Sequence, residues 1–127
     1  MSEATTTVDN FIAAWSRRDV DELMSFFTED AVYENVPIDP PSRGAEAIRK
    51  TLEQFAGTPT QIEFVVHQQT CTGSVVMNER TDRFEMGGKW AEIRVMGVFE
   101  VAGGKIKAWR DYFDLAQFTQ QMTGQDG

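Results

Sequence analysis

The chain has 127 residues and a mass of 14.3 kDa, which predicts a single domain over residues 1–127 with its own hydrophobic core. Its formal net charge of −8 argues against a nucleic-acid partner, because phosphate binding requires a basic surface. No segment approaches the ~18 apolar residues of a membrane span. One cysteine and one histidine allow no internal disulfide, His-rich metal site or Ser-His-Asp triad. We expect a cytoplasmic protein whose chemistry uses carboxylates, Arg, Tyr or amides.

The N-terminal part of the chain has the apolar periodicity of helices. The first predicted helix covers residues 5–18, where one stripe contains Val8, Phe11, Ile12 and Trp15. The second starts at Asp19, which forms a capping-box-like pair with Glu22, and holds Leu23, Met24, Phe26 and Phe27. A short strand over residues 31–36 ends at Pro37, and a third helix begins near Ala45.

From residue 61 onward the pattern is that of strands. Runs rich in β-forming residues cover 61–72, 74–86, 89–101 and 105–113, and glycine pairs at 87–88 and 103–104 predict tight turns. A short helix over residues 115–122 closes the chain, with Asp114 as its cap. Helices followed by an antiparallel meander predict an α+β cone in which the helices cover one face of a curved sheet.

Strand register decides which charged residues share a face. Arg80 and Asp82 are two apart on one strand, so both side chains leave the same face. A two-residue turn at 87–88 places Arg80 opposite Val95, which leaves Arg83, Glu92 and Arg94 on the other face. For the next hairpin we predict a three-residue loop, 102–104, that pairs Val101 with Lys105 and places Asp111 opposite Val95. A strict two-residue turn would instead bring Tyr112 to this position.

One guanidinium between two carboxylates is suited to acid–base chemistry. Arg can bridge Asp82 and Asp111 because its planar fork stays protonated, and the remaining negative charge favours proton uptake by one acid. Tyr33 and Asn35, also two apart on a strand, could hold a water molecule with a carboxylate. Such a group predicts hydrolysis, with one carboxylate removing a proton from water while the other acid donates one. Taken alone, Arg-x-Asp is usually a surface ion pair, so the prediction depends on the joint occurrence of all three motifs.

Three ordered motifs give the chain a family resemblance: Tyr33-Glu34-Asn35, Asn78-Glu79-Arg80-Thr81-Asp82 and Trp109-Arg110-Asp111-Tyr112-Phe113-Asp114. They closely resemble the limonene-1,2-epoxide hydrolase family. The resemblance implies a cystatin-like or nuclear-transport-factor-like cone, with a curved mixed sheet whose concave face is covered by the N-terminal helices. It also implies a homodimer and a reaction that needs no cofactor.

By position in these motifs, Asp111 resembles the base that activates water, and Tyr33 and Asn35 resemble the residues that hold this water. Asp82 resembles the acid that protonates an epoxide oxygen, and Arg80 the bridge between the two carboxyls. The implied partners are a small apolar epoxide and water, and the product is a vicinal diol. Positions that resemble the substrate pocket carry Phe84, Ile93, Val95, Phe113 and Phe118.

Two other functions remain open from the sequence. A proton-transfer enzyme resembling ketosteroid isomerases would need one carboxylate base and a donor such as Tyr33, but it gives Arg80 no clear task. A non-catalytic module that binds apolar ligands is also compatible with a cone fold, although such a binder has no need for buried charges.

Overall fold

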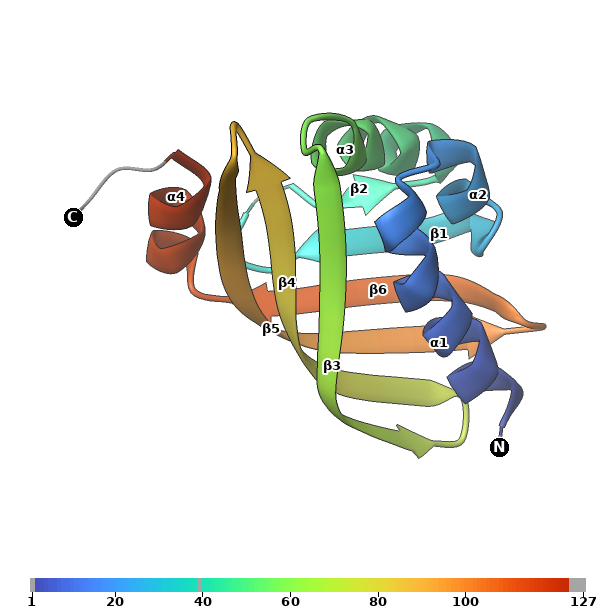
Figure 1. Cartoon of the computed structure of the whole chain (residues 1–127). Coiled ribbons are helices and arrows are strands. Elements are labelled where there is room, and N and C mark those ends of the chain that lie inside the picture. The colour runs from blue at the N-terminus through green and yellow to red at the C-terminus, as the bar shows by residue number, and fades with distance from the viewer. Residues whose placement is uncertain (1, 39, 124–127) are drawn as a thin grey trace.

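A strongly curved six-stranded sheet dominates the computed structural model, which describes residues 2–38 and 40–123 (Figure 1). The strands lie in the order β2-β1-β6-β5-β4-β3; β1 and β6 are parallel, and the other neighbours are antiparallel. Their bounds are β1 (Phe27–Asn35), β2 (Ser42–Arg43), β3 (Gln61–Thr72), β4 (Val75–Met86), β5 (Lys89–Ala102) and β6 (Lys105–Phe113).

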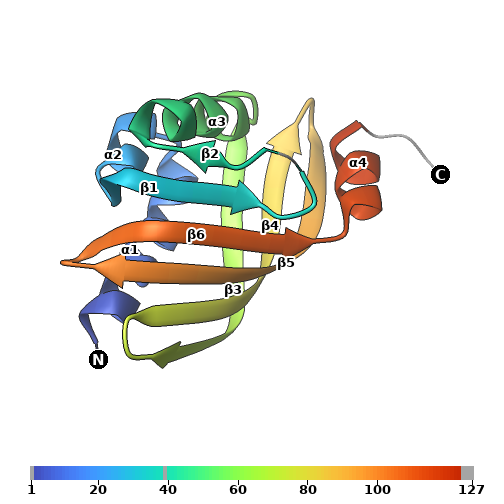
Figure 2. The same ribbon diagram turned by 180° about the vertical axis from the view of Figure 1, so that it is seen from behind.

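The helices lie against the concave face and at the open end of the sheet. They are α1 (Glu3–Ala14), the 3₁₀ turn η1 (Trp15–Arg17), α2 (Val20–Met24), α3 (Ala45–Gly57) and α4 (Leu115–Thr123). Helix α1 crosses β3 to β6, α3 packs on β1 and β2, and α4 packs on β5. From behind, β6 and β5 lie in front of α1 (Figure 2). The predicted α+β cone is confirmed, and no described helix is both long and apolar enough to cross a membrane.

The N-terminal elements differ from the predicted bounds. Ser2 begins α1 earlier, at Glu3, because its hydroxyl accepts the Thr5 N–H at 3.0 Å. The first helix does not continue to residue 18: it gives way to η1, and Arg18 ends that turn with a left-handed φ of 54°. The predicted helical position of Phe27 is wrong. Phe27 opens β1, where it pairs with Ile106 of β6, and the Ile106 N–H donates to the Phe26 carbonyl at 2.7 Å.

The β4–β5 hairpin has the predicted register. Gly87 and Gly88 both have positive φ, as a two-residue turn between twisted strands requires. Met86 pairs with Lys89, and Arg80 consequently pairs with Val95. The same ladder places Asp82 opposite Ile93 and Phe84 opposite Ala91. The six residues of these three pairs are all buried.

The β5–β6 hairpin reaches the predicted face by a different route. Its turn has two residues, since Ala102 pairs with Lys105, so the predicted pairing of Val101 with Lys105 is wrong. A bulge then leaves Lys107 unpaired between the pairs Val101–Ile106 and Glu100–Ala108. This extra residue restores the inward direction of Asp111. Asp111 therefore lies opposite Gly97, two residues along β5 from the predicted partner Val95.

An aromatic cluster joins the helices to the concave face. Phe11 of α1 makes edge-to-face contacts with Trp15, Phe26, Phe27, Phe99 and Trp109 at centroid distances of 5.0–6.2 Å. Trp15 and Trp109 are each 1% exposed. The cluster packs α1 against Trp109 of β6, the strand that also carries Asp111.

Candidate active site

Arg80 lies at the base of the concave face and binds both predicted carboxylates. Its Nε and Nη2 donate to Asp82 Oδ1 and Oδ2, each at 2.9 Å, and Nη2 also donates to Asp111 Oδ2 at 2.8 Å. Arg80 has no exposed surface, and both Asp residues are buried. With both carboxyls ionised, one positive and two negative charges leave the cluster at −1, in a part of the protein where unpaired charge is costly.

Asn78 and two aromatic rings complete the surroundings of Arg80. Asn78 Oδ1 accepts from Arg80 Nη1 at 2.9 Å, so four of the five guanidinium N–H groups are bonded to protein. The amide of Asn78 is held in turn by Gln69, whose Oε1 accepts from its Nδ2 at 3.1 Å. The rings of Phe64 and Phe99 lie 5.3 and 5.9 Å from the guanidinium carbon and provide cation–π contacts.

Gly97 leaves the space through which Arg80 reaches Asp111. Asn78, Gly97 and Asp111 face one another across β4, β5 and β6. A Cβ atom at position 97 would collide with Arg80 Nη1 and would lie 2.9 Å from Asp111 Oδ1 and 3.0 Å from Asn78 Oδ1. The bridge between the two carboxylates therefore requires glycine at this position.

Tyr33 and Asn35 lie beside Asp111. Strand β1 runs parallel to β6, with Tyr33 paired to Trp109 and Asn35 paired to Asp111. The Tyr33 ring stacks on Trp109 with a centroid distance of 4.1 Å and an interplanar angle of 8°, and its hydroxyl donates to Asn35 Oδ1 at 3.1 Å. This bond fixes the Asn35 amide and directs its nitrogen away from Tyr33. The polar pair belongs to the Asp111 side of the site, because β6 and β5 separate β1 from the Asp82 strand.

Trp109 holds the second oxygen of Asp111. Its indole Nε1 donates to Asp111 Oδ1 at 2.7 Å, while the other carboxylate oxygen accepts from Arg80. Trp109 and Asp111 are two residues apart on β6 and share its inner face. The indole and the guanidinium together fix the direction of this carboxyl.

Burial raises the pKa of Asp111 from 3.8 to about 6, against the opposing effect of Arg80 and with the support of the Asp82 charge. Burial also raises the pKa of the Tyr33 phenol well above 10, and the Asp111 charge adds to this effect. Although burial opposes its charge, the carboxylates of Asp111 and Asp82 raise the pKa of Arg80. At neutral pH, Tyr33 is therefore a neutral donor and Arg80 a permanent cation. The carboxyl pair can retain a proton close to neutrality.

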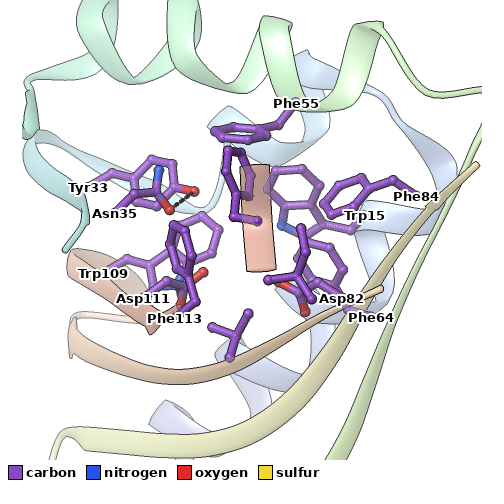
Figure 3. Close-up of a pocket in the computed structure, with 13 residues that line it drawn as sticks. Trp15, Tyr33, Asn35, Phe55, Phe64, Asp82, Phe84, Trp109, Asp111 and Phe113 are labelled. Atoms are coloured by element: carbon purple, nitrogen blue, oxygen red, sulfur yellow. Dashed lines mark hydrogen bonds between the residues drawn. The ribbon is translucent and has the colours of Figure 1, made fainter. Parts of the chain in front are cut away.

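These polar groups line one side of a largely apolar cavity (Figure 3). It contains about 380 Å³ of space between atoms, part of it open to solvent. Asp82, Asp111, Tyr33 and Asn35 supply its polar surface together with the edges of Trp15 and Trp109. Its other walls are Phe55, Phe64, Phe84, Ile93, Val95, Phe113 and Phe118. The lining includes all five residues placed in the pocket by family resemblance.

The sequence alone assigns no task to Asn78 or Gly97, and it leaves open whether Trp15 and Trp109 belong to the core or to the pocket wall. A signal for Asn78 is present, because Asn78, Arg80 and Asp82 follow one another at intervals of two on one strand. Trp109 has the same relation to Asp111. Gly97 can be recognised only from the β5–β6 register. Among residues 2–38 and 40–123, no group of three His, Cys, Asp or Glu side chains is placed to hold a metal ion.

Comparison with known proteins identifies relatives with a similar sequence and fold. The family model for the limonene-1,2-epoxide hydrolase catalytic domain matches residues 2–123. Epoxide hydrolase EphG of Mycobacterium tuberculosis (strain ATCC 25618 / H37Rv) is 35% identical over 108 residues, which cover 85% of this chain and 71% of that protein. The structure of an M. tuberculosis LEH-like epoxide hydrolase is similar with a TM-score of 0.82 and 34% identity, over 96% of this chain and 91% of the other.

A more distant structure shares the fold alone. A protein with a ketosteroid isomerase-like fold from Catenulispora acidiphila DSM 44928 has a TM-score of 0.79 at 19% identity, with coverage of 91% of this chain and 90% of the other. Proteins with different sequences therefore share this cone fold, and the function must be inferred from the residues of the cavity rather than from the fold.

Substitution of Gly97 tests the close approach of Arg80. We expect Gly97→Ala to lower the free energy of unfolding by about 1–3 kcal/mol, because the added methyl must displace the guanidinium or a carboxylate. Gly57→Ala is the matched control: nothing lies within 4 Å of the place that its added methyl would take, and its backbone is not left-handed. Denaturant unfolding of both variants measures the difference. Equal stabilities would contradict the assigned role of Gly97.

The raised pKa of Asp111 predicts a specific dependence of stability on pH. Since the folded-state pKa is the higher one, the contribution of Asp111 is fully present below pH 3.8 and is lost as pH rises through about 6. Over that interval the loss is at most about 3 kcal/mol. Asp111→Asn removes this titration, so the melting temperature of the native protein should fall relative to that of the variant between pH 4 and 7.

Thermal unfolding of the native protein and of Asp111→Asn between pH 4 and 7 measures how the difference between their melting temperatures changes with pH. Asp114→Asn is the control, because Asp114 is exposed and accepts from the Ala116 N–H at 2.8 Å at the start of α4. A constant difference between the native protein and Asp111→Asn would contradict the raised pKa.

Proposed function

Because this chain belongs to the limonene-1,2-epoxide hydrolase family, we propose that it adds water to a compact, largely apolar epoxide in one step and releases a vicinal diol. The observation that carries the proposal is the buried Arg80 bridge between Asp82 and Asp111 beside Tyr33 and Asn35. A strained ether oxygen needs an acid as it leaves, and water needs a base as it attacks. This cluster can provide both at once.

The position of each carboxyl supports a division of roles. Asp111 is the proposed base because it lies beside Asn35, whose amide can donate to a water molecule that also contacts the carboxylate. Tyr33 fixes the direction of that amide through its bond to Asn35 Oδ1. Asp82 is the proposed acid because it lies on β4, which β5 separates from the strands of Asp111 and Asn35. Both carboxyls border the cavity, so an epoxide between them can meet both.

The proposed reaction balances within the pair. Water transfers one proton to Asp111, and its oxygen forms a bond to an epoxide carbon as the bond between that carbon and the epoxide oxygen breaks. The epoxide oxygen takes the proton of Asp82. The product is the diol, and the proton that began on Asp82 is now on Asp111; its return restores the starting state. The protein forms no covalent bond to the substrate, and the reaction as written uses only the epoxide and water.

Two protein donors stabilise the ionised form of Asp111, which predominates above its pKa of about 6. Trp109 and Arg80 each donate to the Asp111 carboxylate, and hydrogen bonds of this kind stabilise the ionised form that a base requires. Arg80 donates to Asp82 as well, so it stabilises the negative charge that moves from one carboxyl to the other during the reaction. The apolar walls strengthen both interactions by excluding solvent.

The ketosteroid-isomerase-like alternative uses less of the site. The donor that the sequence suggests for a substrate carbonyl, the Tyr33 hydroxyl, is engaged, because it donates to Asn35. The alternative also gives no task to a guanidinium that bridges two carboxylates. Isomerisation of an unsaturated ketone without epoxide turnover would favour this alternative. Apolar-ligand binding that is unaffected by Asp111→Asn, without any turnover, would favour a binding module.

Turnover of a panel of cyclic and terpene epoxides by the purified protein tests the proposed function. We expect diol formation, with label from ¹⁸O-water entering the diol directly during a single turnover. Asp111→Asn and Asp82→Asn should each lower the rate by about 10²–10⁴-fold, the range for loss of a general acid or base. Asp114→Asn should retain it, since this exposed carboxylate caps α4. A panel without diol, or label retained by the protein, would exclude the reaction.

We also propose that the protein is a homodimer formed through the outer face of the sheet. Met96 and Tyr112 pair across β5 and β6 on this face, and Met77 borders the same shallow depression as Met96. These three side chains are 42–47% exposed, an unusual grouping of apolar surface on a strongly acidic protein. Trp90 on the same face is 36% exposed, and the guanidinium of Arg83 lies 4.4 Å from its ring.

Sedimentation of the native protein should give the mass of two 14.3 kDa chains. Met96→Glu should shift it toward the monomer, because the new carboxylate would be buried without a partner. Ala45→Glu adds the same charge at an exposed position of α3 and should leave the dimer intact. A native protein of monomer mass would exclude the dimer.

A cytoplasmic location is proposed on chemical grounds. Cys71 is a free thiol in the structure, and it is the only cysteine in the chain, as is common for proteins of a reducing compartment. Fractionation of cells that produce the protein would test this location, which recovery outside the cytoplasm would contradict.

A further inference from the structure

Trp15 places a hydrogen-bond donor in the cavity that no described protein group accepts. Its Nε1 is the one buried side-chain nitrogen or oxygen without a partner among residues 2–38 and 40–123. The residue is 1% exposed and lines the same cavity as Asp82 and Asp111. In Figure 3 the Trp15 ring stands at the wall with Phe64 and Phe84, on the Asp82 side of the cavity.

The direction of this donor is fixed by ring packing. Trp15 stacks on Phe64 at a centroid distance of 4.8 Å and an interplanar angle of 23°, and it meets Trp109 edge to face at 5.9 Å. Phe64 is the cross-strand partner of Asp82, so the stack anchors the indole beside the proposed acid. The ring cannot turn to find another acceptor without losing these contacts.

An indole N–H held in this way lowers stability unless a ligand satisfies it. A buried donor without an acceptor costs about 1–3 kcal/mol. The other indole of the cavity wall has its partner, since Trp109 donates to Asp111. Tyr33, Asn35, Asp82 and Asp111 are likewise bonded to protein and are used by the proposed reaction. Trp15 is thus a donor that neither the fold nor the reaction employs.

We propose that Trp15 Nε1 donates to a second oxygen of the substrate, and that the substrates are therefore epoxides that also carry a neutral ether, carbonyl or hydroxyl oxygen. This inference rests on the proposed hydrolase function for its substrate class. The reacting oxygen receives its proton from Asp82, which leaves the indole for another acceptor. That acceptor is uncharged, because Arg80, the cation of the site, is already bonded to Asp82 and Asp111, and a buried anion would lack a partner. Trp15 is a specificity-determining residue under this proposal.

A pair of unreactive ligands tests the donor without any turnover. Cyclohexanone and methylenecyclohexane have the same shape and differ in the acceptor oxygen. The protein has three Trp residues, so its ¹H–¹⁵N spectrum should contain three indole signals. Trp90→Phe identifies the exposed one, and Asp111→Asn shifts that of Trp109, which leaves the signal of Trp15. We expect cyclohexanone, and not methylenecyclohexane, to move the Trp15 indole proton downfield.

The affinities provide a second readout. Trp15→Phe should weaken cyclohexanone binding about 5- to 100-fold more than methylenecyclohexane binding, the range expected for a lost hydrogen bond. Trp90→Phe is the matched control and should weaken neither. An unmoved Trp15 signal, or equal weakening of both ligands, would overturn the proposal. The spectrum of the native protein decides the question even if Trp15→Phe does not fold.

Turnover separates this inference from the function on which it rests. With an epoxide panel, Trp15→Phe should lower kcat/KM for oxygen-bearing epoxides and spare plain hydrocarbon epoxides. An equal loss of kcat on both kinds would assign the indole to the reacting oxygen and overturn the proposal. If no epoxide is hydrolysed but cyclohexanone still moves the Trp15 signal, the donor stands while the hydrolase function and the substrate class fail.

Discussion

A positive charge without exposed surface is the constraint on which the rest of the structure depends. Arg80 can be buried only if its N–H groups find acceptors, and these come from Asp82 and Asn78 on its own strand and from Asp111 two strands away. Bonding across β5 requires all three strands to be in register and requires Gly97 to lie beneath the guanidinium. Correct folding of the sheet and correct assembly of the site are thus one event.

The same arrangement explains why the cavity can hold two carboxylates. One guanidinium shared by Asp82 and Asp111 compensates half of their charge, and the apolar walls keep the other half from being screened. Burial and the negative charge of Asp82 therefore raise the pKa of Asp111 more than Arg80 lowers it. Aromatic packing around Phe11 and Trp109 supplies stability that this site does not. The aromatic cluster that stabilises the fold thus lies next to the charged residues proposed to react.

Prediction from sequence succeeds where chemistry and spacing lie on one strand. Arg80 with Asp82, and Tyr33 with Asn35, share a face because alternate residues of a strand point the same way. The relation between Arg80 and Asp111 depends on residue count across a hairpin, and nothing in the composition of 105–114 distinguishes a longer turn from a bulge. The direction of the Trp15 indole is equally inaccessible, since apolar periodicity predicts an unbroken helix where the chain forms η1. Backbone irregularities set both features, and they leave a weak sequence signal.

The unpaired Lys107 limits how the β5–β6 hairpin can change in length. If one residue were added to or removed from the β5–β6 ladder, every later residue of β6 would point to the opposite face of the sheet. Tyr112 would then face Arg80 in place of Asp111. A second change of one residue, in the turn or at the bulge, cancels the first. Viable relatives should therefore conserve the parity of the segment between Gly97 and Asp111 while varying its length in steps of two. The β1 ladder on the other side of β6 also shifts register here, between Phe27 and Val32, so both neighbours of β6 accommodate the odd residue.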